Sequence, residues 1–317
     1  MAKHGVHLGL TPWLISSEAD AQSLGRQGAL AESWGYESFW LPESHFVGDG
    51  AIPEPLMMLA SVAAHTQRLR LATTSFLLPL RHPLQAAEQV AVLDRLSNGR
   101  VTLGVGRGYQ PAMFSAFNIS RKDKRRIFEW CLETMIKAWS GEAVALHEDA
   151  EPVILSPLPV QRPHPPIWVA AFGPKALAQA GSLGLPYIAS PMEPIARLQE
   201  NYGLHREACI NANSAQPAEV PVMRTVFVSD DARLVSRVRE KLEHQAREMS
   251  RTGLRKGMSI EVDDWALIGD RARVRDQVAR YVDELGVTHL IVTRLRIGHL
   301  DAVDLENSVA TMAELMG

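Results

Sequence analysis

Cysteine is scarce in this chain of 317 residues, which contains two, Cys131 and Cys209. Two cysteines in separate helical patterns give neither a disulfide framework nor the paired spacing of a zinc site. We therefore interpret both as ordinary packing residues of a protein from a reduced compartment.

The chain also lacks an excess of basic charge and any long apolar run. The formal net charge is -3, so the positive surface expected of a nucleic-acid binder is missing. No apolar run approaches the length of a membrane span, and residues 1–13 lack the basic-then-apolar layout of a signal peptide. We expect a soluble, cytoplasmic protein with a small-molecule partner, and neither nucleic acid nor membrane as a partner.

Hydrophobic residues make up 46% of the chain, enough for one large core. Eight strand candidates alternate with helical patterns, and parallel strands need such crossover helices. The order predicts an α/β fold, a single (β/α)8 TIM barrel over residues 1–317, with an open doubly wound sheet as the alternative. The strand candidates are Val6 to Trp13, Ser38 to Pro42, Leu69 to Leu78, Val101 to Gly106, Ile167 to Ala171, Tyr187 to Pro191, Val222 to Ser229 and His289 to Leu295.

Two segments interrupt this alternation. Residues 140–166 carry six prolines, too many for a helix or a central strand, and predict an insertion after the fourth strand and its helix. Residues 251–266, mixed in charge and containing Gly253 and Gly257, predict a second insertion after the seventh strand. Either segment could be a lid over an active site or a plain surface excursion.

Chemically useful side chains follow several predicted strands, where a parallel sheet places its active site. His45, after the second strand, could act as a base, as a hydrogen-bond donor or as a loop residue. Arg107, between two glycines after the fourth strand, suits a phosphate or a surface turn. Arg125 lies in a basic helix opening where positive charge opposes the helix dipole. The loop Phe172-Gly173-Pro174 enters a helix with free amides.

The segment from Phe39 to Gly108 resembles the bacterial luciferase-like flavin monooxygenases. The likeness continues to Arg125, resumes from Pro165 to Pro186 and is weaker from Leu267 to Val292. It implies that Arg107, Arg125 and the amides of Phe172, Gly173 and Ala176 hold the phosphate of FMN. It also implies a non-proline cis peptide bond between Thr74 and Ser75, behind the flavin ring.

Two departures from the family pattern concern the catalytic centre. Many members carry adjacent histidines where this chain has Ser44 and His45, and the first of them acts in catalysis. A serine cannot replace that base near neutral pH, so His45 is the expected catalytic contact at the Ser44-His45 pair. The reactive cysteine of light-emitting members is Gly106 here. We therefore expect no bioluminescence.

The resemblance implies an oxidoreductase, a flavoprotein monooxygenase. It would use reduced FMN, delivered by a separate flavin reductase, and O2 to oxygenate a small organic substrate. Two alternatives stay open: a deazaflavin-dependent hydride-transfer enzyme of the same superfamily, and a non-catalytic flavin-binding protein. Family analogy also implies a homodimer packed through helices near the second and third strands.

A metal site is the remaining alternative, because barrel hydrolases gather histidines at strand ends. His4 and His7 would lie on opposite faces of the first strand, and His82 stands in a strand-to-helix turn. No His-x-His pair accompanies them, so we predict no metal. Trp13 and Met192, at strand ends, could line an apolar pocket or pack in the core.

Overall fold

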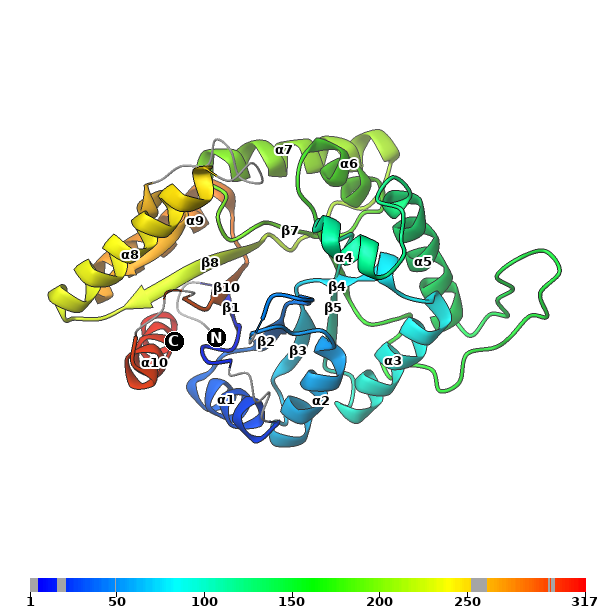
Figure 1. Ribbon diagram of the computed structural model, residues 1–317, viewed down its shortest axis with the longest axis horizontal. Helices are drawn as coiled ribbons and strands as arrows, with labels where there is room; N and C mark the ends of the chain where they lie inside the picture. The colour runs from blue at the N-terminus through cyan, green and yellow to red at the C-terminus, as the bar shows by residue number, and fades with distance from the viewer. Residues whose placement is uncertain (1–4, 16–20, 49, 252–260, 296, 298–299) are drawn as a thin grey trace. The chain divides into compact units, whose positions relative to one another are not determined.

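The computed structural model describes residues 5–15, 21–48, 50–251, 261–295, 297 and 300–317. Parallel strands and helices alternate along these residues in the order of a (β/α)8 barrel, an α/β fold (Figure 1). The chain forms two compact units. Unit 1 comprises residues 1–15, 30–39 and 171–317, and unit 2 comprises residues 16–29 and 40–170. Because the segments interleave, no single cut in the sequence separates the units.

The strands of unit 2 centre on β5 (Val101–Gly106), which is buried along its whole length. It pairs in parallel with β3 (Arg70–Thr73), β4 (Phe76–Leu77) and β6 (Ile167–Ala170). Continuous burial of an apolar strand is typical of a parallel sheet covered by helices. The helices are α2 (Pro55–His65), α3 (Pro83–Leu96), the short α4 (Pro111–Ala116) and α5 (Lys124–Trp139), with a 3-10 turn η1 (Leu78–Leu80) before α3.

Unit 1 contains β1 (His7–Leu10), which pairs in parallel with β10 (His289–Thr293) and with the start of β2 (Ser38–Leu41). β8 (Pro221–Val228) lies between β10 and β9 (Ala266–Gly269). The remaining elements are β7 (Tyr187–Ile188), α6 (Pro174–Ser182), α7 (Ile195–Ala212), α8 (Ala232–Arg251), η2 (Val262–Asp264), α9 (Arg271–Leu285) and α10 (Ala302–Met316). Helix α1 (Ala21–Trp34) contributes residues to both units.

Several predicted element ends are confirmed. Pro174 stands in the first turn of α6, and Gly173 before it has φ +81°, a conformation that glycine adopts without strain. The Asp270 side chain accepts a hydrogen bond from the Arg273 backbone N–H at 2.8 Å and caps α9. Helix α9 ends at Gly286 in the left-handed conformation, as expected of a C-terminal glycine.

The predicted strand list needs two corrections. The single strand expected from Leu69 to Leu78 is two strands, β3 and β4, separated at Thr74 and Ser75. β9 was not predicted, because Ala266 was assigned to the irregular segment 251–266 and the apolar stretch is only four residues long. Residues 252–260 of that segment lie outside the described residues, and the described remainder forms the end of α8, η2 and the start of β9.

The proline-rich segment 140–166 runs from the end of α5 to β6 without a helix, and one isolated bridge joins Val144 to Val153. Part of it extends away from the helices of unit 2 (Figure 1). The part of this segment that leads back to β6 is fixed by buried Asp94. The Asp94 carboxylate accepts hydrogen bonds from the backbone N–H groups of Val160 and Gln161 at 2.8 and 2.9 Å. Gln161 also reaches Val101 at the amino end of β5. Residues 160 and 161 therefore lie at the amino ends of the strands, whereas His45 follows the carboxyl end of β2. This position argues against a lid over His45.

A buried polar network in unit 1 fixes the chain after β7. The Glu193 carboxylate accepts hydrogen bonds from Tyr187, Asn201 and the Ser190 backbone N–H at 3.0, 2.8 and 2.9 Å. Arg224, which is fully buried on β8, donates to the Glu193 carbonyl at 2.7 Å and to the Tyr281 hydroxyl at 2.7 Å. Burial raises the pKa of Glu193, and the three hydrogen bonds and Arg224 oppose that rise only in part.

The raised pKa of Glu193 predicts a pH-dependent stability. The folded protein binds a proton at Glu193 more tightly than the unfolded chain, so this stabilisation is complete below the ordinary value of 4.5 and is lost as pH rises through the folded pKa. The thermal midpoint of the wild type minus that of Glu193→Gln should therefore decrease as pH rises above about 4.5. Glu207→Gln, at an exposed position on α7, the helix that follows Glu193, is the control. A difference that stays constant with pH would contradict the assignment.

Candidate active site

The loop after β2 places His45 in a buried position on unit 2. Its Nε2 atom lies 2.8 Å from Oε1 of Glu43, and its side chain is 7% exposed. Glu43 is fully buried; its Oε1 also accepts from Arg81 Nη1 at 2.7 Å, and its Oε2 accepts from the Leu77 backbone N–H at 2.9 Å. A buried carboxylate needs such partners, and here each oxygen has at least one.

Ser44 has a different role from its neighbour. Its backbone exchanges hydrogen bonds with Ile52 at 2.9 and 3.2 Å, and its hydroxyl accepts from the Ile52 backbone N–H at 3.0 Å. These bonds close the loop that carries His45. Ser44 therefore shapes this loop, and of the expected Ser44-His45 pair only His45 keeps a nitrogen without a hydrogen-bond partner among the described residues.

Two aromatic side chains lie beside the imidazole of His45. Phe117 meets the His45 ring edge-on at 5.0 Å between ring centres, and Phe46 lies 5.8 Å from it. Phe46 has φ +57°, which is strained for a bulky residue, and its side chain is 68% exposed. Strained residues that persist in a fold gather at working sites, because the surroundings must enforce them. The surroundings of His45 are therefore a candidate site.

The Thr74–Ser75 peptide bond is cis, as predicted. The Thr74 backbone N–H donates to the Leu41 carbonyl at 2.8 Å, at the end of β2, so the bond lies beside the loop that carries His45. Ser75 faces Gly106 at the end of β5: a Cβ atom placed on Gly106 would collide with the Ser75 hydroxyl and approach the Ser75 Cβ to 2.8 Å. The glycine found in place of a cysteine at Gly106 is therefore required by Ser75.

Arg107 belongs to a basic cluster, which we define as Arg107, Arg121, Lys122, Lys124, Arg125 and Arg126. Residues 107–129 hold these six cations and two acidic residues, Asp123 and Glu129, in a chain of net charge -3. Burial lowers the pKa of Arg107, repulsion from Arg125 lowers it further, and Glu129 opposes both. Crowded positive charge of this kind is stabilised by an anion.

Lys124 links the basic cluster to an open depression on the surface of unit 2. Burial, Arg107 and Arg121 lower the pKa of Lys124, in that order. Its Nζ donates to the Gly108 carbonyl at 3.3 Å and lies 5.6 Å from the centre of the Phe114 ring. The depression has a volume of about 720 Å³ and is lined by Phe114, Ser115, Ile119, Ser120, Arg121, Lys122 and Lys124. A lining that combines apolar side chains with three cations suits an amphipathic anion.

Phe172, Gly173 and Ala176 lie at the start of α6 in unit 1. Phe172 is 69% exposed. The Ala176 backbone N–H donates to the Gly173 carbonyl at 3.0 Å. The first amide groups of a helix after a glycine loop are suited to anions, and the assignment of the Phe172, Gly173 and Ala176 amides to the phosphate stays a prediction.

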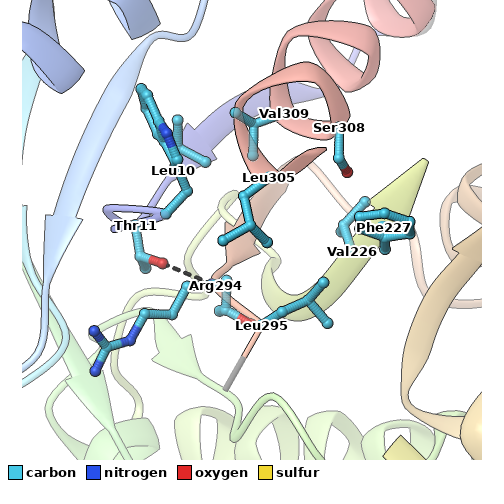
Figure 2. A pocket seen from close by; sticks show the side chains of 11 residues that line it. Leu10, Thr11, Val226, Phe227, Arg294, Leu295, Leu305, Ser308 and Val309 are labelled. Atoms are coloured by element: carbon cyan, nitrogen blue, oxygen red, sulfur yellow. Dashed lines mark hydrogen bonds between the residues drawn. The ribbon is translucent and has the colours of Figure 1, made fainter. Parts of the chain in front are cut away.

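A small hollow in unit 1 lies at the ends of β1 and β10. Figure 2 shows Leu305, Val226 and Leu295 around it, with the Arg294 backbone N–H bonded to the Thr11 hydroxyl at 2.9 Å. The hollow has a cavity volume of about 10 Å³, measured as the space open to the centre of a water-sized sphere, and this is about enough to hold one water molecule. Trp13 lines this hollow, and its buried indole N–H has no acceptor among the described residues. Met192 packs against the core around Phe227 and Trp265.

The histidines considered for a metal have other surroundings. His7 bonds to Glu37 at 2.6 Å and stacks on His289, while His82 is exposed before α3, and His4 lies outside the described residues. In the described part of the chain, no three potential metal ligands come together. Within that same part, no helix combines the length and apolar character needed to cross a bilayer.

The sequence model of the family described as Luciferase-like monooxygenase matches residues 4–289, and the chain belongs to this family of oxidoreductases. An uncharacterised protein of Sinorhizobium fredii, y4vJ, is 29% identical over 72% of this chain and 69% of its own length. The oxygenase component of a flavin-dependent trigonelline monooxygenase from Acinetobacter baylyi is 26% identical over 63% of this chain and 57% of its own length.

Solved structures share the fold along nearly the whole chain. Monooxygenase RslO1 from Streptomyces bottropensis has a TM-score of 0.80 and 26% identity, covering 98% of both chains. The oxygenating constituent of a Pseudomonas putida 3,6-diketocamphane monooxygenase, in complex with FMN, has a TM-score of 0.83 and 20% identity over 98% and 97%. An F420-dependent reductase from Methanopyrus kandleri has a TM-score of 0.75 and 17% identity, covering 98% of each chain. The last two likenesses show the fold alone.

The contact between Gly106 and Ser75 predicts a steric response to substitution. Gly106→Ala should lower the free energy of unfolding by about 1–3 kcal/mol, because the new methyl group meets a packed neighbour. Adding Ser75→Gly should restore part of the loss, whereas adding Ser75→Ala should restore little, since the Cβ atom remains. Gly203→Ala on α7, with nothing within 4 Å of its added Cβ, is the control and should not destabilise the fold. Thermal unfolding measures all four variants; an undisturbed Gly106→Ala protein would refute the contact.

Proposed function

We propose that this protein is a flavin-dependent monooxygenase that uses reduced FMN and O2 to oxygenate a small organic substrate. The main support for this proposal is a group of features on unit 2. Buried His45 is held by Glu43, the cis Thr74–Ser75 bond lies beside its loop, and the basic cluster follows β5. Reduced FMN, when bound, would supply two electrons and the substrate two more, so that one atom of O2 enters the substrate and the other leaves as water.

The residues of unit 2 fit the phosphate of such a cofactor. Arg107 carries a planar guanidinium, which can donate two parallel hydrogen bonds to a phosphate. Arg125 and Lys124 add positive charge beside it, and a dianion would relieve the mutual repulsion that lowers the pKa of Arg107. In the proposal, Thr74 and Ser75 contact the flavin ring. The family resemblance separately implies the amides of Phe172, Gly173 and Ala176 as contacts of the phosphate.

The remaining side chains would prepare the reaction. His45 would contact the substrate or the reacting oxygen through Nδ1, the nitrogen without a hydrogen-bond partner among the described residues. The exposed rings of Phe46 and Phe117 would cover the mouth of the site and exclude water around it.

Two protein partners belong to this proposal. A separate flavin reductase would supply reduced FMN, as the words "oxygenase component" in the name of the Acinetobacter relative suggest. A second copy of the chain would pack against α2 and α3, where Met57 and Leu96 expose 75% and 65% of their side chains. Large exposed apolar side chains on neighbouring helices favour an interface.

The phosphate assignment predicts a selective loss of affinity. Arg107→Gln should weaken FMN binding by about 1.5–3 kcal/mol, the contribution of a hydrogen bond to a charged group, or roughly 10–100-fold in Kd. Riboflavin, which has no phosphate, should bind the variant and the wild type equally. Arg126→Gln removes a more exposed cation of the same cluster and should change FMN affinity less. Fluorescence titration measures the affinities; equal losses for FMN and riboflavin would place Arg107 away from the phosphate.

The catalytic assignment predicts that binding and turnover separate. His45→Ala should reduce turnover by about 100-fold or more, the usual contribution of a general acid or base, while FMN affinity changes by less than about threefold. His82→Ala, which removes an exposed histidine of unit 2, should leave both unchanged. Turnover is measured as steady-state oxidation of a substrate that the wild type accepts, and FMN affinity is measured by flavin titration. Parallel loss of turnover and affinity in His45→Ala would indicate a structural role.

A further inference from the structure

Glu43 is bound by three donors from separate parts of unit 2. The His45 Nε2 atom and Arg81 Nη1 share its Oε1 at 2.8 and 2.7 Å, and the Leu77 backbone N–H binds its Oε2 at 2.9 Å. The Glu43 side chain is fully buried, so these contacts replace its hydration. Glu43 thus ties the loop after β2 to β4 and to the turn before α3.

Arg81 is held as firmly as Glu43. Its side chain is 11% exposed, and its guanidinium carbon lies 3.8 Å from the centre of the Phe76 ring. Its Nη1 also approaches the Leu77 carbonyl at 3.4 Å, and its Nη2 lies 3.4 Å from Glu54, whose side chain is half exposed. An arginine keeps its charge in proteins, so Arg81 balances an ionised Glu43.

An ionised carboxylate can only accept hydrogen bonds, so an ionised Glu43 requires a hydrogen on Nε2 of His45, the atom 2.8 Å from its Oε1. Because Arg81 already balances the charge of Glu43, the imidazole need not take a second proton to neutralise the carboxylate. The neutral imidazole then has its lone pair on Nδ1.

Nδ1 of His45 is open to a ligand. It makes no hydrogen bond to any described residue, yet it does not belong to the buried polar atoms that lack a partner, which are Trp13 Nε1, Trp265 Nε1 and Gln277 Oε1. The atom can therefore be reached from outside the protein.

We propose that Glu43 and Arg81 are positioning residues that fix His45 as a proton acceptor through Nδ1. This inference rests on the proposed function and makes it more specific: the molecule that meets His45 must present a proton, as a hydroxyl, an N–H or an acidic C–H beside a carbonyl does. Glu43 sets the tautomer and the ring orientation, and Arg81 keeps Glu43 ionised without leaving His45 charged.

The tautomer can be measured directly by NMR of protein labelled with 15N in its histidines, in the absence of substrate. The His45 signals are identified by their loss in His45→Ala. At neutral pH the wild type should show a protonated Nε2 and an unprotonated Nδ1. A proton on Nδ1, or on both nitrogens, would overturn the inference. This readout needs no activity and no second variant that must fold.

Substitution of Glu43 should change this tautomer. In Glu43→Gln the amide oxygen can keep accepting from the Leu77 backbone N–H, which places the NH2 group where Oε1 was. That NH2 group donates to Nε2, which moves the His45 proton to Nδ1 and removes the acceptor. The turnover number should fall by about 10–100-fold or more, as expected when a general base has the wrong tautomer, with Kd for FMN within about twofold. Glu54→Gln changes a more exposed carboxylate near Arg81 and should leave the tautomer and turnover unchanged.

Removal of Arg81 provides the complementary test. Arg81→Met leaves Glu43 with His45 as its charge partner, so both nitrogens of His45 should be protonated at neutral pH. An unchanged His45 tautomer in both Glu43→Gln and Arg81→Met would overturn the inference. Flavin titration of the same samples tests the proposed function separately. If the wild type does not bind FMN, the proposed monooxygenase activity is refuted, while the measured tautomer of His45 is unaffected.

Discussion

The buried Glu43 carboxylate is the interaction on which the site of unit 2 depends. It joins its own loop, through His45, to a segment more than 30 residues further along the chain, through the Leu77 backbone and Arg81. A buried carboxylate without these donors would cost several kcal/mol, so the loop after β2 and the chain before α3 are held in one arrangement. The orientation of His45 is a consequence of this constraint.

Much of the fold could be predicted from the sequence, because alternating apolar strands and capped helices carry their own signals. Val101 to Gly106 is entirely apolar or glycine apart from Thr102, and the predicted and observed strands coincide. The strand from Ala266 to Gly269 escaped because four residues carry too weak a pattern beside an irregular segment. The position of segment 140–166 could not be predicted either, since it depends on Asp94, which looks like any other helical aspartate in the sequence.

The site could be predicted only in part. His45 and Arg107 were found because a histidine and a glycine-flanked arginine at strand ends are chemically conspicuous, and the cis bond at Thr74–Ser75 followed from the family resemblance. Arg81, Phe117 and the hydrogen-bond role of Glu43 were missed, because contacts between distant segments leave no local pattern. The occupied amide of Ala176 could not be foreseen for the same reason: it depends on how the first turn of α6 closes onto Gly173.

The proposed activity requires that this chain binds reduced FMN and directs its reaction with O2. The most direct measurement is an anaerobic titration of the wild-type protein with reduced FMN, followed by rapid mixing with O2 while absorption spectra are recorded. We expect saturable binding of reduced FMN. After mixing with O2, we expect a protein-dependent absorption spectrum that differs from those of reduced and oxidised flavin and that decays faster when a substrate is added. Absence of binding, or reoxidation at the rate of free flavin, would contradict it and favour the deazaflavin enzyme or the non-catalytic flavin-binding protein.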